Sequence, residues 1–392
     1  MINKQTWDFI RQHTADDVRK LALQGTKEAD VDLPMALQQI AGRQTARKKL
    51  PSWAAVDGVL YPPHLNMEQC SSEQTARYKA LLAGSGDTYV DLTGGLGVDF
   101  YWMSQHFKQR YYIEQNAELC TLAEHNFHTL GLASSVCCCN AATYLPDMLH
   151  ADVIFLDPAR RNEHGGRTYD IRDCTPNILE LLPLLMEKAD KIILKLSPMF
   201  DWRKAVDDLQ HVTEVHIVSV DNECKELLLV VESVVRPLRL VCVNNDQRFE
   251  VPSAISHHTS TVNHQPSTIT PQPSYLYEPN ASIMKAGCFT ALLQHYPVEQ
   301  ISANSHLFLS SVEIEDFPGR RFQICAISST NMQSLKETLA GIERANITVR
   351  NFPLSVEQRR KKLHLKDGGD TYIFATTKAD GTHCLYICRK IG

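Results

Sequence analysis

The residues best suited to chemistry follow predicted strands, beginning with the run YVDLTGGLGVD at 89–99. Asp91 closes a short apolar run, and Gly95 and Gly97 belong to a glycine-rich turn ahead of an apolar-periodic segment. This order is typical of a first strand that leads into a helix in a parallel α/β domain. Glycines there let the backbone approach a ligand closely, and the free N–H groups of the helix start face that ligand.

Two ligands fit such a turn, a dinucleotide or S-adenosylmethionine, and a purely structural turn is the alternative to both. A dinucleotide fingerprint needs a third glycine three residues after Gly97, where Phe100 stands, so pyrophosphate binding is disfavoured. The next predicted strand ends in Glu114, whose carboxylate is placed to accept hydrogen bonds from ribose hydroxyls. A third ends at Asn140, whose amide could read an adenine edge.

A fourth predicted strand, 152–156, is apolar and β-branched, as expected for a buried parallel strand, and ends in Asp157-Pro158-Ala159-Arg160-Arg161. This succession resembles the class I S-adenosylmethionine-dependent methyltransferases. Asp91, Gly95 and Gly97 match the family's cofactor loop, Glu114 its ribose acid, and Asp157 its catalytic strand end. The family usually has glycine where Thr93 stands, and Thr93 is counted with the cofactor-binding positions.

The whole chain also resembles bacterial methyltransferases that carry a C-terminal THUMP-like domain. Four motifs support this closer resemblance: DPARR at 157–161, KELLL at 225–229, YEPN at 277–280 and RNFP at 350–353. The resemblance implies a Rossmann-like α/β methyltransferase sheet, an N-terminal helical region, and a C-terminal α+β module that is ferredoxin-like or THUMP-like. It also implies S-adenosylmethionine as the cofactor and structured RNA, tRNA or rRNA, as the partner.

Length and composition agree with a soluble protein of several domains. The 392 residues are too many for one compact core, and 43% hydrophobic with 22% charged residues is ordinary. No signal-peptide core or membrane-length apolar run is present, and the twelve cysteines lack metal-site spacing, so we expect reduced thiols in the cytoplasm and no metal. The net charge of −5 confines any nucleic-acid binding to local patches.

The predicted domains are an N-terminal helical domain at 1–70, a methyltransferase domain at 71–235, a linker at 236–274 and an α+β domain at 275–392. The linker prediction is based on a Ser-, Thr-, His- and Pro-rich segment at 252–274 without apolar periodicity. Strands are expected at 215–220 and 226–231 as the last two of the methyltransferase sheet. Helices are expected at 281–295, 332–345 and 357–365.

A lysine-rich set of candidate catalytic residues accompanies Asp157. Lys79 precedes the first strand, Lys195 lies in the fifth and Glu226 begins the last. Ribose 2′-O-methyltransferases carry a Lys–Asp–Lys–Glu tetrad at similar places, and in that chemistry a lysine of lowered pKa steers the 2′-hydroxyl. Structural ion pairs are the alternative. The aromatic residue typical of amino-methylating sites after Asp157 is missing, and the target atom stays open.

Basic residues mark two candidate RNA-binding segments. Arg160 and Arg161 open a polar loop, 160–173, at the position where substrates bind in this architecture. The helix predicted at 357–365 carries four consecutive cations, Arg359, Arg360, Lys361 and Lys362, which form the best nucleic-acid patch in the sequence. A solvated helix face is the alternative. Two other functions remain possible: a non-catalytic RNA-binding protein on this fold, or a methyltransferase of small molecules or proteins.

Overall fold

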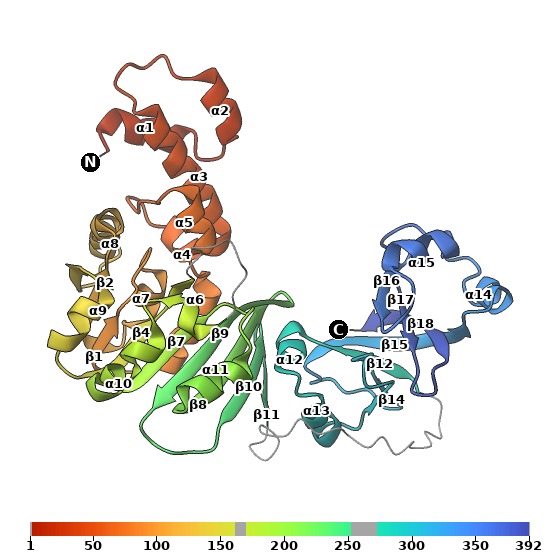
Figure 1. Cartoon of the computed structure of the whole chain (residues 1–392). Helices are drawn as coiled ribbons and strands as arrows, with labels where there is room; N and C mark the ends of the chain where they lie inside the picture. Colours follow the sequence, from red (N-terminus) through yellow and green to blue (C-terminus); the bar gives the residue numbers. More distant parts are fainter. Residues whose placement is uncertain (1, 161–169, 252–272, 392) are drawn as a thin grey trace. The chain divides into compact units, whose positions relative to one another are not determined.

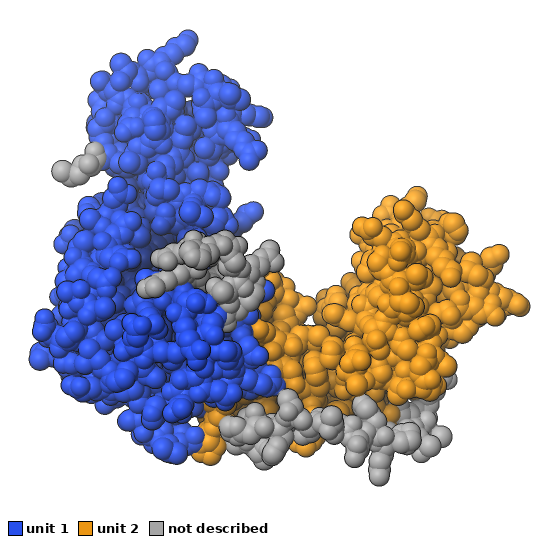
Figure 2. Space-filling view, in the orientation of Figure 1, with its two compact units in different colours: residues 1–215, 226–236 blue, residues 216–225, 237–392 orange. Residues whose placement is uncertain are grey.

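The computed structural model describes residues 2–160, 170–251 and 273–391 (Figure 1). The chain forms two compact units, shown in different colours in Figure 2. Unit 1 comprises residues 1–215 and 226–236, and unit 2 comprises residues 216–225 and 237–392. The predicted helical region 1–70 therefore belongs to the same compact unit as residues 71–215 of the predicted methyltransferase domain.

Among the described residues, six helices precede the first strand, and their ends follow the capping signals in the sequence. Asp17 caps the second helix, which ends at Gly25 with a φ of 67°, and Asp32 caps the third. The helices are α1 (Lys4–Gln12), α2 (Val18–Gln24), α3 (Leu33–Lys49), α4 (Pro51–Ala54), α5 (His64–Gln69) and α6 (Glu73–Ala83). This confirms the helical N-terminal region.

A nine-stranded sheet follows, in the order β11-β10-β8-β9-β7-β4-β1-β2-β3. Strands β7, β4, β1, β2 and β3 are parallel, so their carboxyl ends share one edge, whereas β9 is antiparallel to β7. The parallel strands are β1 (Gly86–Asp91), β2 (Phe107–Glu114), β3 (Ser135–Cys138), β4 (Ala151–Leu156) and β7 (Ala189–Leu196). The helices between and after them are α7 (Val98–Met103), α8 (Ala117–Thr129), α9 (Ala141–Tyr144), α10 (Ile178–Lys188) and α11 (Trp202–Leu209). The predicted α/β fold is confirmed.

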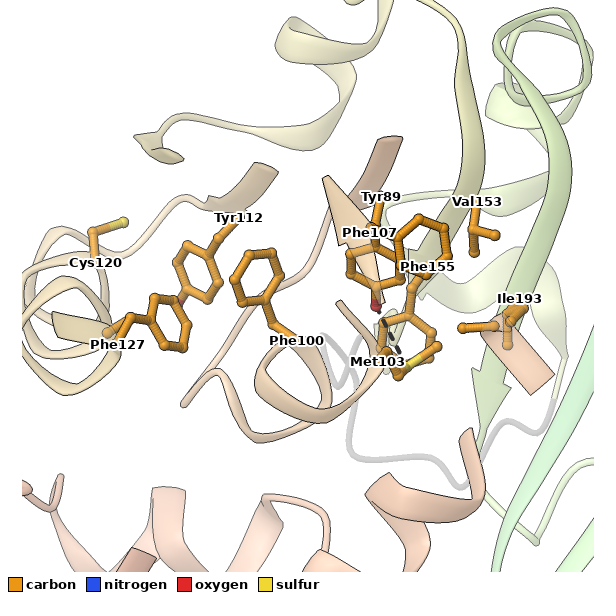
Figure 3. Close-up of a cluster of buried hydrophobic side chains, with 12 residues drawn as sticks. Tyr89, Phe100, Met103, Phe107, Tyr112, Cys120, Phe127, Val153, Phe155 and Ile193 are labelled. Carbon is orange, nitrogen blue, oxygen red and sulfur yellow. Dashed lines mark hydrogen bonds between the residues drawn. The ribbon is translucent and has the colours of Figure 1, made fainter. Parts of the chain in front are cut away.

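An aromatic cluster fixes the glycine turn to the sheet (Figure 3). Phe100, fully buried on α7, lies between Tyr112 and Phe127 on one side and Tyr89 on the other, with ring centroids 4.9–5.9 Å apart. The position at which a dinucleotide fingerprint has glycine is therefore a core residue here. Short elements complete this part of the chain: η1 (Leu145–Asp147), β5 (Ala159–Arg160), η2 (Ile171–Asp173) and β6 (Cys174–Thr175).

The linker predicted at 236–274 is wrong for residues 239–251. Its residues 239–251 form two antiparallel strands, which follow β8 (Val212–Val220) and β9 (Glu223–Glu232) and extend the sheet beyond β8. These added strands are β10 (Arg239–Asn244) and β11 (Gln247–Val251), so 215–220 and 226–231 are strands but not the last ones. Val241 and Val243 are buried, which the polarity of the neighbouring segment concealed. Residues 252–272 lie outside the described part of the chain.

The C-terminal module is built on a seven-stranded sheet in the order β13-β14-β12-β15-β18-β17-β16. Its strands are β12 (Tyr275–Pro279), β13 (Glu299–Gln300), β14 (Phe308–Ser310), β15 (Gly319–Ser329), β16 (Asn346–Arg350), β17 (Thr371–Thr377) and β18 (His383–Ile391). Its helices are α12 (Ala281–Ala286), α13 (Phe289–His295), α14 (Met332–Thr338) and α15 (Val356–Leu363). The helix predicted at 281–295 is broken because Gly287 adopts a left-handed φ of 66°, and the helix predicted at 332–345 ends early, before Gly341.

Candidate active site

A cavity of about 310 Å³ opens at the carboxyl ends of the parallel strands in unit 1. Two predicted catalytic residues, Lys79 and Glu226, do not line it. Eight of the predicted site residues do: Asp91, Thr93, Gly95, Gly97, Glu114, Asn140, Asp157 and Lys195. The fold thus brings together, from five successive strand ends, side chains that are up to 104 positions apart in the sequence (91 to 195). A concave site at this edge is where ligands bind in open α/β sheets.

The glycine turn has no room for side chains at two of its positions. A Cβ atom at Gly94 would lie 2.1 Å from the Tyr112 ring, and one at Gly97 would lie 2.6 Å from the Phe127 ring. Gly95 is different: it has a φ of 56°, and a Cβ atom there would meet only the Thr93 carbonyl, at 3.9 Å. A side chain at Gly95 would therefore enter open space beside the cavity. Gly94 is a site residue that the sequence reasoning passed over, although the Gly94-Gly95 doublet was a signal for it.

Hydrogen bonds hold the turn against the neighbouring strand ends. Glu114 accepts hydrogen bonds from the N–H groups of Gly95 and Asn116, both at 2.9 Å, and the N–H of Asp157 donates to Thr93 Oγ1 at 2.6 Å. Thr93 thus links the glycine turn to the end of β4. Each Glu114 oxygen keeps a further lone pair, so the carboxylate can still accept from a ligand.

Asn140 lines the cavity, and its side chain already has structural partners. Its carbonyl oxygen caps α9 by accepting from the Ala142 N–H at 2.8 Å, and its NH₂ group donates to Gln115 Oε1 at 3.1 Å. An adenine edge would have to share these groups. The Asn140 assignment therefore remains a prediction.

Asp157 and Lys195 form the charged pair that faces the cavity. Lys195 Nζ lies 2.5 Å from Asp157 Oδ2 and 3.6 Å from Asp99 Oδ2. The Asp157 side chain is 39% exposed, the Lys195 side chain 14%. Of this pair, Asp157 is the more accessible to a substrate.

Lys79 and Glu226 form a second pair behind the first. Lys79 Nζ lies 2.8 Å and 2.6 Å from the two carboxylate oxygens of Glu226, and the two side chains are 0% and 3% exposed. Each of these two buried charges compensates the other, and removing either one would leave the other buried without a partner. The four residues of the predicted tetrad are thus gathered, but half of the set is sealed from the cavity.

Asp99 joins the two pairs and was not predicted as a site residue. Its Oδ1 lies 3.1 Å from Lys79 Nζ, its Oδ2 accepts from Ser71 Oγ at 2.7 Å, and Lys195 Nζ lies 3.6 Å away. The carboxylate also lines the cavity. In the sequence Asp99 is an ordinary acid in the first turn of a helix, so only the fold gives it this position.

Charge and burial set the pKa values of these groups. Burial disfavours the charged form of Lys195, but Asp157, Asp99 and Glu226 outweigh it and raise the pKa of this lysine. Lys195 is therefore a stable cation, opposite to the lowered pKa expected from ribose-methylating chemistry. Burial acts against ionised Asp99 too, but Lys79 and Lys195 overcome it and lower the pKa of Asp99. For Glu226, burial prevails over both lysines and raises the pKa.

Asp91 is a buried carboxylate with one oxygen left for a ligand. Its Oδ1 accepts from the Thr93 N–H at 2.9 Å, while its Oδ2 has no donor among the described residues. Burial raises the pKa of Asp91 well above its usual value. Burying a carboxylate costs free energy, and a ligand that donates a hydrogen bond to Asp91 Oδ2, or carries positive charge near it, would offset that cost.

The N-terminal region contributes a wall of the cavity that the sequence reasoning missed. Asn66 and Gln69 of α5 line it, as do Cys70 and Ser71 of the connection to α6. Glu73 anchors this segment by accepting from the Ser52 N–H at 2.9 Å and Ser52 Oγ at 2.6 Å. Polar residues in a helix–helix connection gave no sequence signal of this contact.

The predicted basic surface requires a correction. Arg359 is 1% exposed, with its guanidinium 4.6 Å from the Phe352 ring, and Arg360 pairs with Asp367 at 2.6 Å. Lys361 and Lys362 on α15 are exposed, as is Lys366 beyond it. Four consecutive residues point around a helix rather than along one face, so the four cations cannot all meet one phosphate backbone. Arg160 follows Ala159 in the short strand β5, and Arg161 lies outside the described residues.

Within the described residues, no helix is long and apolar enough to cross a membrane. The same residues contain no group of three or more His, Cys, Asp or Glu side chains arranged to hold a metal ion.

The parallel sheet, the glycine turn and the carboxylates at its edge define the architecture of a class I methyltransferase. Two family models match the C-terminal module: a ferredoxin-like domain over residues 275–318 and a THUMP domain-like region over residues 319–390. The chain also matches the crystal structure of a candidate methyltransferase from Porphyromonas gingivalis W83, with 30% identity, a TM-score of 0.87 and 100% coverage of both chains. The protein belongs to the same family as that methyltransferase, as its resemblance to methyltransferases with a THUMP-like domain predicted.

Two more distant structures match parts of the chain. A class I S-adenosylmethionine-dependent methyltransferase candidate from Listeria monocytogenes has 10% identity and a TM-score of 0.39, over 62% of this chain and 93% of that one. TrmK from M. capricolum, in complex with S-adenosylhomocysteine, has 13% identity and a TM-score of 0.31, over 40% and 66%. At these TM-scores neither match bears on function. A comparison with curated proteins found no match.

Proposed function

We propose that this protein is an S-adenosylmethionine-dependent methyltransferase that acts on structured RNA, with tRNA and rRNA as the candidate substrates. The observation that carries the proposal is the cavity lined by the glycine turn, Glu114 and the Asp157–Lys195 pair. The RNA assignment is supported by the THUMP-like match at 319–390 and by the exposed lysines on and beside α15.

The residues present fit the proposed cofactor. Carboxylates of Asp91, Asp99, Glu114 and Asp157 line the cavity and favour a ligand with positive charge. Asp91 Oδ2 offers an acceptor that has no donor among the described residues, and Glu114 can accept from ribose hydroxyls. S-adenosylmethionine, when bound, supplies a methyl group on a positively charged sulfur.

The protein's own part is to orient the RNA nucleophile and to accept the proton that it loses. Asp157 is the accessible carboxylate for that proton, because Asp99 contacts both lysines and Glu226 is enclosed with Lys79. Lys195 stays protonated and can donate a hydrogen bond to the target atom or hold Asp157 in place. Lys79 and Glu226 act behind this pair and do not line the cavity.

Within this proposal, the target atom stays open between a ribose 2′-hydroxyl and a base nitrogen. Lys79, Asp157, Lys195 and Glu226 are gathered, but Lys195 has a raised pKa, and Lys79 and Glu226 do not line the cavity. Ala159 offers no ring for a base to stack on, which speaks against a base nitrogen. Alkaline hydrolysis separates the two targets: a 2′-O-methyl group blocks cleavage of the next phosphodiester and leaves a methylated dinucleotide, whereas a base methyl group leaves a mononucleotide.

The direct test is mass mapping of modified nucleosides in RNA from cells with and without the gene. We expect one modification to disappear without the gene and to return when purified protein and S-adenosylmethionine are added to that RNA. An unchanged set of RNA modifications would refute the RNA assignment. Cofactor binding by the purified protein would then leave a small-molecule or protein methyltransferase as the alternative.

The cofactor assignment is tested separately by calorimetry with Gly95→Val. A branched side chain at this position enters the open space beside the cavity, so we expect binding of S-adenosylmethionine to be lost. Gly131→Val is the matched control, because Gly131 has a similar φ of 73° with nothing within 4 Å and does not line the cavity. Equal affinity in the Gly95 and Gly131 variants would contradict the assigned site.

A further inference from the structure

Asp99 is the carboxylate through which the cavity-facing pair and the sealed pair are connected. It contacts both ammonium groups, Lys79 at 3.1 Å and Lys195 at 3.6 Å, and its own side chain is only 10% exposed. The charges therefore alternate along a line of five groups: Asp157, Lys195, Asp99, Lys79 and Glu226. Removing the central negative charge would leave two neighbouring cations with less compensation between them.

Asp99 is itself held in place from two directions. Its backbone belongs to α7, which the aromatic contacts of Phe100 fix to the sheet, and its Oδ2 accepts from Ser71 Oγ at 2.7 Å. Ser71 Oγ also accepts from Lys79 Nζ at 3.2 Å. Ser71, in the connection between α5 and α6, thus helps to fix the carboxylate that lies between the lysines.

We propose that Asp99 is a positioning residue, which holds the Lys195 ammonium group in the orientation that places Asp157 for proton acceptance. This inference rests on the proposed methyltransferase function. Asp99 acts through Lys195 rather than on the substrate, because Lys195 Nζ lies between it and Asp157. Its loss should therefore slow methyl transfer while leaving the glycine turn and cofactor affinity nearly intact.

The decisive variant is Asp99→Asn, which keeps the shape and an acceptor for Ser71 but removes the charge. Using tritiated S-adenosylmethionine and bulk RNA from cells lacking the gene, we expect kcat to fall by about 10–100-fold with little change in KM for the cofactor. Asp87→Asn is the matched control. Asp87 pairs with Lys108 on the surface at 2.5 Å and is 68% exposed, so its kcat should stay within about twofold of the parent.

A readout without cofactor separates a positioning role from a merely structural one. In cofactor-free protein, the Lys195 ammonium protons, assigned by the loss of their resonance in Lys195→Arg, should exchange with water faster in Asp99→Asn than in the parent, because a negative charge that holds this group is gone. If Asp99→Asn does not fold, Ser71→Ala provides the same test in milder form, since it removes one contact that orients Asp99. We expect a loss of several-fold in kcat and no change in net charge.

Unchanged kcat and unchanged proton exchange of the Lys195 ammonium group in Asp99→Asn, or in Ser71→Ala where the former does not fold, would overturn the inference. This outcome is distinguishable from failure of the proposed function. In that case the parent protein itself would not bind S-adenosylmethionine or transfer a methyl group, and proton exchange at the Lys195 ammonium group would still report whether Asp99 holds Lys195.

Discussion

Both units bury a carboxylate between two cations, but the two arrangements serve different ends. In unit 1, Asp99 lies between Lys79 and Lys195, and the series continues to Asp157 at a cavity. In unit 2, Glu278 is 4% exposed and accepts from Arg320 and from Arg350 Nη2 at 2.9 Å. The Glu278 group does not line the cavity formed by residues 341–344, 370, 371 and 389 of unit 2, and its arginines are each 37% exposed.

The Glu278 group joins segments that are separate in the sequence and in the family models. Glu278 lies in the ferredoxin-like match, whereas Arg320 and Arg350 lie in the THUMP-like match. Glu278 and Arg320 are directly opposite each other on β12 and β15, and Arg350 ends β16. Two motifs singled out in the sequence, YEPN and RNFP, therefore meet in one ionic contact that ties the module together.

The two groups also use different cations, which are lysines around Asp99 and arginines around Glu278. Arginine presents a fixed fork of donors that suits a permanent structural pair, whereas a lysine is a compact point charge whose protonation responds to its surroundings. The comparison teaches that a buried charged group alone does not identify an active site. A neighbouring cavity that the group lines is also needed.

The largest expected effect comes from Asp157→Ala, which removes the exposed end of the unit 1 series. We expect methyl transfer to fall by roughly 10²–10⁴-fold, because the proton acceptor is lost, while calorimetry shows retained S-adenosylmethionine binding. Asp190→Ala is the control, as Asp190 is 72% exposed and contacts only His150, at 3.6 Å, among its described ion pairs. If Asp157→Ala turns over at nearly the rate of the parent, the unit 1 series has no more part in the chemistry than the Glu278 group of unit 2, and the comparison fails.

An intermediate effect, on stability rather than chemistry, is expected from Glu278→Gln. Both arginines lose their charged partner, and we expect the free energy of local opening in β12 and β15 to fall by about 1–3 kcal/mol. Hydrogen exchange of peptides from 275–329 measures this, with kcat unchanged. Glu313→Gln is the matched control, because Glu313 is 44% exposed and lies 3.6 Å from Arg321. Equal exchange in both variants would count against a structural role for Glu278.

The smallest effect is expected from charge reversal on α15, Lys361→Glu with Lys362→Glu. If these exposed lysines meet phosphates, RNA binding should weaken and the slope of log affinity against log salt should decrease by about 1 for each lost contact. Cofactor affinity should not change. The reversal of Lys20 and Lys27, two exposed lysines of the N-terminal region, alters net charge equally. The same loss in both double variants would mean that only overall charge matters.

The sequence by itself determined most elements of the parallel sheet and their order. Gly25 and Asp32 mark helix ends because capping depends on residues one to three positions away. The glycine turn after β1 and the apolar strand before Asp157 are equally local signals. Their order along the chain was enough to predict that Asp91, Glu114 and Asp157 come together, since parallel strands end at a common edge.

Only the tertiary structure decided which charged residues share a site and which are sealed away. Asp99 looked like a helix-start acid, Arg359 like a surface cation, and 239–251 like part of a linker. Each interpretation failed because burial depends on what packs against a residue from distant segments: Ser71, Lys79 and Lys195 for Asp99, Phe352 for Arg359, and β8 for β10. Electrostatics follows the same rule, because the pKa of Lys195 is set by Asp157, Asp99 and Glu226, none of them a near neighbour in the chain.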